Sequence, residues 1–175
     1  IALIAALALG CGFILRSSRL PEQATRALIG LLFGFVAIVG MMLPVVYRPD
    51  IIFDGRSIII SVAGFSAGPL AAAIAALLAA AYRYHLGGGG MLMGVSVIAC
   101  SGIIGSVYYC LRKRSPLFNT SPAIYAFGIV VHLCMLGLTA LLPPEVRLAT
   151  LKAIALPVML FYPLGTLFVC RVLLE

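Results

Sequence analysis

Long apolar stretches constrain this chain more than any other feature. Six of them follow one another along 175 residues, at roughly 1–15, 24–47, 57–82, 88–110, 122–142 and 150–170. Most reach the ~20 residues that a helix needs to cross a bilayer core. With 63% hydrophobic residues, 10% charged residues and a mean hydropathy of +1.20, the chain cannot cover itself with a water-soluble surface. We therefore predict an integral membrane protein.

The membrane-spanning elements are expected to be helices. Lipid offers no partner to unpaired backbone groups, and no ten-residue alternating pattern suggests a barrel. The fold class is therefore all-α, a polytopic membrane helix bundle forming one domain over residues 1–175. The first stretch begins abruptly at Ile1 and the last closes with "FVCRVLLE", so we expect a domain that is truncated at its N-terminus.

The third apolar stretch, "SIIISVAGFSAGPLAAAIAALLAAAYR", is interrupted by Gly68-Pro69. Proline lacks a backbone donor and disfavours helical geometry in the residue before it. Two interpretations follow. Either the stretch is one tilted, broken helix and the chain has six spans, or it re-enters by the same face and the chain has five crossings. A re-entrant segment is tolerated where protein buries its bend.

The lysines and arginines help to choose between these topologies. Six spans would divide them six against six, which gives no orientation. Five crossings divide them seven against five, or seven against three if Arg56 and Arg83 are set aside as functional. The larger group is Arg16, Arg19, Arg26, Arg112, Lys113, Arg114 and Arg171. This mild bias predicts a cytoplasmic C-terminus and an N-terminus outside.

A second argument concerns the distance between Arg56 and Arg83. One straight helix over 56–83 would hold them about 40 Å apart at ~1.5 Å per residue. A break near Gly68-Pro69 brings them to one face of the membrane instead.

The segment "FDGR" contains the first candidate binding residues. Asp54 and Gly55 can initiate a turn, after which Arg56 would anchor a helix at the headgroup level. Alternatively, the Arg56 guanidinium offers a planar fork of donors to a carboxylate or phosphate while Asp54 holds it in place.

The segment "YRYHLGGGG" contains the second group. Arg83, between two tyrosines, is either an interfacial anchor or an anion ligand. The glycines after it, with Gly88 and Gly89 at their centre, permit a tight turn whose amides can cradle an anion. His132 in "VVHLCML" lies in the middle of a span, where it either bonds a neighbouring helix or contacts a ligand.

Several classes of function are not expected. Five acidic residues are spread over the chain, without a nucleophile motif or metal-ligand spacing, so we expect no catalysis, metal or cofactor in this chain. The net charge of +7 is not a basic stripe with interleaved aromatics, so we do not expect nucleic acid as a partner. The "GxxxGP" of 64–69 and the alanines that follow predict close helix packing.

The residues together resemble a known family. "GMMLPVVYRPDIIFDGRSIIISVAGFSAGPLAAAIAALLAAAYRYHLGGGG" is similar to the 5TM receptor domain of the LytS-YhcK type, and the resemblance continues through "SGIIG", "LFN", "VVHLCML" and "LPVMLFYPLGTLF". The glycine-proline step, the D/N-x-R element and the arginine before a glycine-rich turn occur in the order typical of that family.

The resemblance implies a sensor domain in the bacterial inner membrane that controls a cytoplasmic diguanylate cyclase or histidine kinase following it in the chain. Some histidine kinases of this family recognise small carboxylates such as pyruvate, through arginines that match Arg56 and Arg83. Those sensors also use a cysteine and a serine in the next helix, where this chain has Gly94 and Val97. The departure puts pyruvate in doubt and leaves a small anion as the expected ligand, in a domain expected to form a homodimer.

Two alternatives remain from the sequence. A weaker similarity of the glycine-proline helix to membrane components of vitamin uptake systems keeps a solute-binding or transport subunit open. The third possibility is a passive anchor that dimerises an output domain through "GxxxG".

Overall fold

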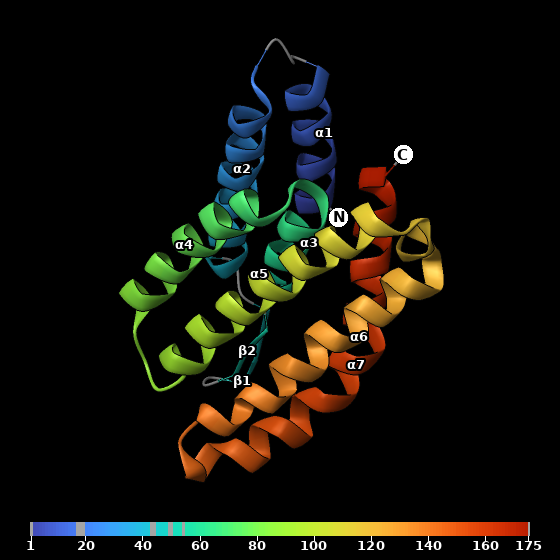
Figure 1. Ribbon diagram of the computed structural model, residues 1–175. Coiled ribbons are helices and arrows are strands. Elements are labelled where there is room, and N and C mark those ends of the chain that lie inside the picture. Colours follow the sequence, from blue (N-terminus) through green and yellow to red (C-terminus); the bar gives the residue numbers. More distant parts are fainter. Residues whose placement is uncertain (1, 17–19, 43–44, 49–50, 54, 175) are drawn as a thin grey trace.

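The computed structural model describes residues 2–16, 20–42, 45–48, 51–53 and 55–174. Within these ranges the chain forms a bundle of helices and one short strand pair (Figure 1). The helices are α1 (Ala2–Arg16), α2 (Glu22–Met42), α3 (Arg56–Ala67), α4 (Pro69–Leu86), α5 (Met91–Arg114), α6 (Ser121–Gly137) and α7 (Pro144–Leu174), with 3-10 turns η1 (Pro116–Asn119) and η2 (Leu138–Leu141). The strands are β1 (Val45–Arg48) and β2 (Ile51–Phe53).

Five of the described helices are long and apolar enough to cross a membrane, which confirms a polytopic helical bundle. They are α2, α4, α5, α6 together with η2, and α7. Large apolar side chains point away from the bundle: Phe13 is 75% exposed, Leu77 72% and Phe161 66%. A surface of this kind is stable against lipid and not against water.

The third apolar stretch is broken and reverses direction at Gly68. α3 ends at Ala67, Gly68 has φ +84°, and Pro69 begins α4 as its first residue. Glycine suits this left-handed conformation, and proline tolerates a first helical turn. α4 then runs back along α3 (Figure 1). The two pieces therefore pack against each other, whereas the six-span alternative would join them end to end as one tilted, broken helix. We expected the apolar stretch to end at residue 82, but α4 extends to Leu86 and is one of the five helices long and apolar enough to span.

α3 is the centre of the bundle. It packs against α2, α4, α5, α6 and α7, and Ile60, Val62 and Phe65 have no exposed surface. Gly64 lies directly against the backbone of Gly105 and Ser106 in α5. The glycines of "GxxxG" thus serve packing within the chain, as predicted, and Gly64 is too buried to form the dimer contact that the passive-anchor interpretation assigned to it.

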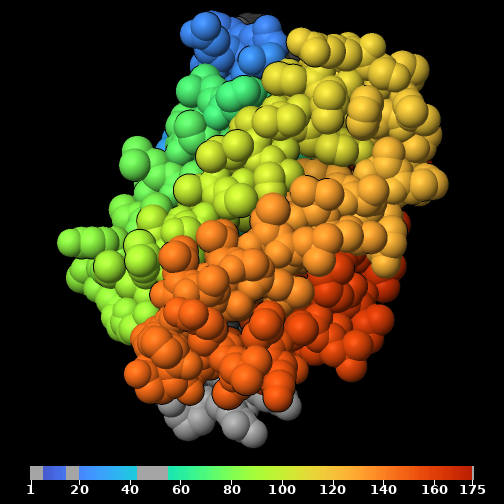
Figure 2. Space-filling view, turned by 60° about the horizontal axis from the view of Figure 1, so that its bottom comes forward, coloured from blue at the N-terminus to red at the C-terminus, as the bar shows by residue number. Residues whose placement is uncertain are grey.

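The helices alternate in direction, so their ends gather on two sides of the molecule (Figure 1). What we call the C-terminal end holds the start of α2, the α3–α4 turn, η1 and the end of α7. The opposite hairpin end holds β1 and β2, the α4–α5 turn and the α6–α7 turn. Figure 2 is turned toward the hairpin end and shows the green end of α4 beside the start of α5, with the orange α6–α7 turn next to them.

The strand pair is a feature that we did not predict, and it lies where the apolar stretch of 24–47 ends and before that of 57–82 begins. β1 and β2 are antiparallel, with Val45 opposite Phe53 and Val46 opposite Ile52, and the register is irregular before Arg48. Two runs of β-branched and aromatic residues around a short polar step are typical of a hairpin.

Candidate functional site

Arg56 is the first residue of α3 and lies half-buried at the hairpin end. Gly55 precedes it as the N-cap and supplies no side chain to the free amides of the first turn. These amides carry the positive end of the helix dipole. Asp54, which we expected to orient Arg56, lies outside the described residues, so that role stays a prediction.

Arg83 lies in the last turn of α4, at the same end of the molecule as Arg56. Its Nη1 donates a hydrogen bond of 2.7 Å to the carbonyl of Gly87. Its stem crosses α5 at Gly94: a Cβ on that glycine would lie 2.5 Å from Nε and 3.1 Å from Cγ and Cδ of Arg83. The stem of Arg83 therefore occupies the space that a side chain at position 94 would need.

The glycine turn after α4 fixes Arg83 through a carbonyl. Gly87 has φ +63° and Gly88 has φ +82°, a left-handed conformation that side chains disfavour. Gly88 and Gly89 are exposed, and a Cβ on Gly88 would meet no atom within 4 Å. The turn thus positions Arg83, and direct ligand contact by Gly88 and Gly89 stays a prediction.

His132 is fully buried in α6 and bonds a neighbouring helix. Its Nδ1 lies 2.7 Å from the Gly128 carbonyl, and its Nε2 lies 3.2 Å from the Ser57 hydroxyl. A carbonyl only accepts, so Nδ1 carries the proton and Nε2 accepts from Ser57. The edge of the His132 ring meets Tyr162 of α7 at 5.1 Å between ring centres. This is the interhelical hydrogen bond that we weighed against a ligand contact.

Ser57 is a residue of this region that we did not single out from the sequence. It follows Arg56 directly, is 1% exposed and links the start of α3 to α6. The sequence signal for a buried polar residue here is the hydroxyl of Ser57 directly before a run of three isoleucines. The bond fixes the helix turn that carries Arg56.

The depths of Arg56 and Arg83 can be compared along α5. Ile60 of α3 lies beside Gly102, and Arg83 lies beside Gly94. α3 and α5 run in the same direction, since Gly64 of α3 lies beside Gly105. Arg56 is four residues before Ile60, so it lies at about the level of residue 98 in α5. That level is four residues from Gly94, which at ~1.5 Å per residue places Arg56 about 6 Å along α5 from the level of Arg83. The two arginines therefore lie at similar depths in the bundle.

Comparison with protein families identifies a model that covers most of the chain. The family model 5TM-5TMR_LYT, described as the 5TMR of 5TMR-LYT, matches residues 13–175. The chain belongs to this family. It is therefore a membrane sensor domain and is not itself catalytic, in agreement with the resemblance found in its sequence. No curated protein and no solved structure gave a match.

Proposed function

We propose that this 5TMR-LYT domain binds a small carboxylate at the hairpin end, between Arg56 and Arg83. The observation that supports the proposal best is the α3–α4 reversal, because it returns Arg83 to the end of the bundle at which Arg56 begins α3. Two guanidinium groups provide donors of the planar geometry that suits a carboxylate.

The surroundings add further positive potential. The amides of the first turn of α3 have no side-chain cap, so they can donate to an anion beside Arg56. Arg83 is held by Gly87 and by the groove at Gly94, which lowers the entropy that binding must remove. In this proposal Asp54 orients Arg56 and the glycine turn closes the site.

The signal would leave through α7. This helix contains Pro157 and Pro163, and Gly128 of α6 packs directly on Pro163. At its far end Arg171 donates two bonds, of 3.1 and 2.6 Å, to the Ser121 hydroxyl at the start of α6. A ligand that favours one packing of α6 and α7 would change the position of α7, and through it a cytoplasmic cyclase or kinase domain in a homodimer.

The proposed orientation places the C-terminal end in the cytoplasm of a bacterium. Among the described residues, six basic positions lie at that end and five at the hairpin end, or three once Arg56 and Arg83 are set aside. The six are Arg16, Arg26, Arg112, Lys113, Arg114 and Arg171. The bias agrees with the positive-inside rule. A reporter that is active only in the cytoplasm, fused after Glu175, tests the orientation and should be active.

The ligand proposal is tested with the purified domain in nanodiscs and a panel of small carboxylates that includes pyruvate. Arg56→Gln and Arg83→Gln should each weaken the best-binding carboxylate by about ten-fold or more, the value of one charge-assisted hydrogen bond. Lys152→Gln, an exposed change of the same charge at the same end, is the control and should bind as the wild type does. Unchanged affinity in both arginine variants, or no binding from the whole panel, would overturn the proposal.

A further inference from the structure

A second polar region lies at the C-terminal end, away from Arg56 and Arg83. It is a pocket of about 320 Å³ lined by Ser66 of α3, Tyr109, Arg112 and Lys113 of α5, and Asn119 of η1. Its volume is at the lower limit of small-molecule sites, so it suits a compact group. Tyr109 also covers Gly68, where α3 turns into α4.

Arg112 is fixed in this pocket by three contacts. Its Nε donates to Asn119 Oδ1 at 2.7 Å, its Nη1 donates to the Phe65 carbonyl at 2.7 Å, and its Cζ lies 3.9 Å above the centre of the Phe65 ring. Its third nitrogen, Nη2, donates to no acceptor among the described residues. No fully buried side-chain nitrogen in the described part of the chain lacks a partner, so Nη2 keeps some accessible surface. Arg112 is part of the pocket lining.

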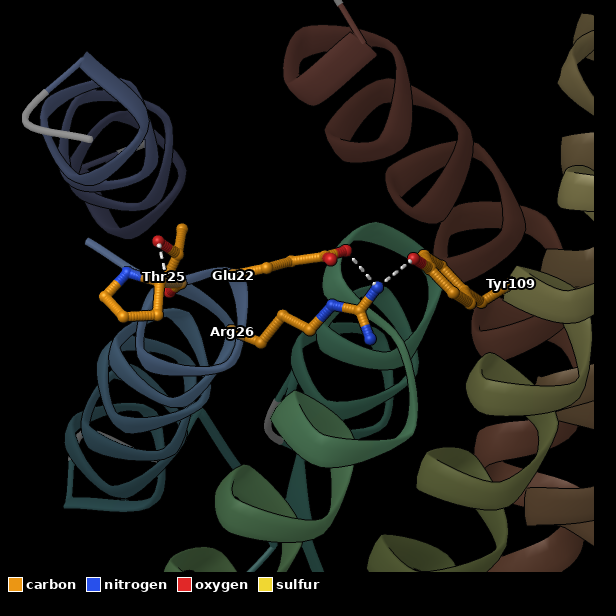
Figure 3. A network of polar contacts seen from close by, with 5 residues as sticks. Glu22, Thr25, Arg26 and Tyr109 are labelled. Atoms are coloured by element: carbon orange, nitrogen blue, oxygen red, sulfur yellow. Dashed lines mark hydrogen bonds and ion pairs between the residues drawn. The ribbon is translucent and has the colours of Figure 1, made fainter. Parts of the chain in front are cut away.

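The other lining side chains also present donors. Asn119 uses its oxygen for Arg112, so its amide nitrogen remains available. The Tyr109 hydroxyl accepts from Arg26 at 2.9 Å and keeps its own proton to donate (Figure 3). Lys113 lies 5.6 Å from the centre of the Tyr109 ring and bonds no acceptor within the described ranges. A site with four kinds of donor and two positive charges selects an anion with several oxygens.

Acidic side chains do not cancel this charge. Glu22 is bound to Arg26 at 2.6 Å and is 77% exposed, and it is not part of the pocket lining (Figure 3). The only other acidic residue with a described side chain, Glu145, lies in the first turn of α7 at the hairpin end. The pocket therefore holds the positive charges of Arg112 and Lys113 where a membrane helix reaches the headgroup layer.

We infer that this pocket binds a phosphate group, carried either by the headgroup of an anionic phospholipid or by a soluble phosphate compound. Phosphate offers the several oxygens and the negative charge that the donors require. A basic pocket between helices at the membrane surface is suited to lipid headgroups, and the same donors accept a free phosphate. Its occupant would contact the turn between α3 and α4, at the opposite end from the proposed carboxylate.

The test compares two neighbouring residues of equal charge. Both are exposed, but Lys113 lines the pocket and makes no described hydrogen bond, whereas Arg114 lies outside the lining. The domain in detergent is titrated with dioctanoyl phosphatidylglycerol, with inorganic pyrophosphate and with zwitterionic dioctanoyl phosphatidylcholine, and native mass spectrometry measures each dissociation constant. Lys113→Gln should weaken phosphatidylglycerol binding about five-fold, and Arg114→Gln less than two-fold.

Each result decides a part of the inference. Binding of phosphatidylglycerol alone identifies a lipid headgroup, and binding of pyrophosphate as well identifies a site for phosphate from either source. Equal effects of the Lys113 and Arg114 variants, or binding of phosphatidylcholine as tight as that of phosphatidylglycerol, would overturn the inference. Arg112→Lys keeps the positive charge but loses the planar guanidinium, so it should weaken phosphatidylglycerol binding. Thermal unfolding of this variant is measured in parallel to show that it is folded. Because no carboxylate is present, failure here leaves the proposed carboxylate site untouched.

Discussion

The hydroxyl of Ser57 donates to Nε2 of His132 at 3.2 Å, and this bond joins the first turn of α3 to the middle of α6. Both side chains are buried, so if either one is removed, water cannot take its place as the hydrogen-bond partner of the other. Ser57 follows Arg56, which makes the bond a determinant of where that arginine stands.

Ser57→Ala should therefore destabilise the domain. His132 would keep its bond to Gly128 but lose the partner of Nε2 in an apolar interior, at a cost of about 1–2 kcal/mol. Thermal unfolding in detergent measures the change. Ser106→Ala is the matched control, because the Ser106 hydroxyl bonds Gly102 in its own helix and joins no second element. Equal effects of the two substitutions would contradict this role of Ser57.

Gly94→Ala should change ligand binding more than stability. The new methyl group would displace the stem of Arg83 from its position across α5. The stem is flexible, so this displacement costs little stability. We expect carboxylate affinity to fall about ten-fold, as for loss of the arginine, with little change in unfolding temperature. Gly137→Ala, at a helical glycine with no neighbour within 4 Å, serves as the control and should bind normally.

Gly88→Ala should strain the turn after α4. The φ of +82° costs a residue with a side chain about 1–2 kcal/mol, although there is open space around the position. Gly89→Ala is a close control, because that residue is not in the left-handed region and its nearest neighbour would be Pro143 at 3.7 Å. If the two variants unfold at the same temperature, backbone strain is ruled out as the reason for glycine at position 88.

Gly64→Ala should separate α3 from α5. Its Cβ would lie 2.7 Å from the backbone nitrogen of Ser106, and backbone cannot rotate away as a side chain can. Overpacking of this kind costs about 1–3 kcal/mol. Gly40→Ala provides the comparison, since the nearest atom would be Ile59 Cδ1 at 3.9 Å. The unfolding temperature should fall for the first variant and stay near that of the wild type for the second.

Much of the helical framework could be predicted because the deciding chemistry is local. The break at Gly68-Pro69 follows from the missing proline donor and the freedom of glycine, and the lengths of the apolar stretches follow from bilayer thickness. The pairing of β1 with β2 is not predicted, because polar Arg48 interrupts the two short runs of strand-forming residues. The apolar stretch ends at residue 82 whereas α4 extends to Leu86, because Arg83 and His85 end the apolar run without ending the helix.

The contacts of the candidate site could not be predicted, because they join residues far apart in the chain. The sequence indicates that His132 needs a partner, and it does not indicate that the partner is Ser57, 75 positions away. Likewise, the glycine at position 94 first appeared as a missing family residue. Only the fold shows that Arg83 lies across it.

The shortness of α3 has a mechanical consequence. Twelve residues make a rod of about 18 Å, stiff on that scale and shorter than a hydrocarbon core of about 30 Å. Its first turn is tied to α6 by Ser57, and its last turn is tied to α5 by the bond from Arg112 to the Phe65 carbonyl. A rod tied at both ends cannot be pulled at one of them without moving the other. A displacement of Arg56 at the hairpin end would therefore be transmitted along α3 towards Arg112 at the C-terminal end.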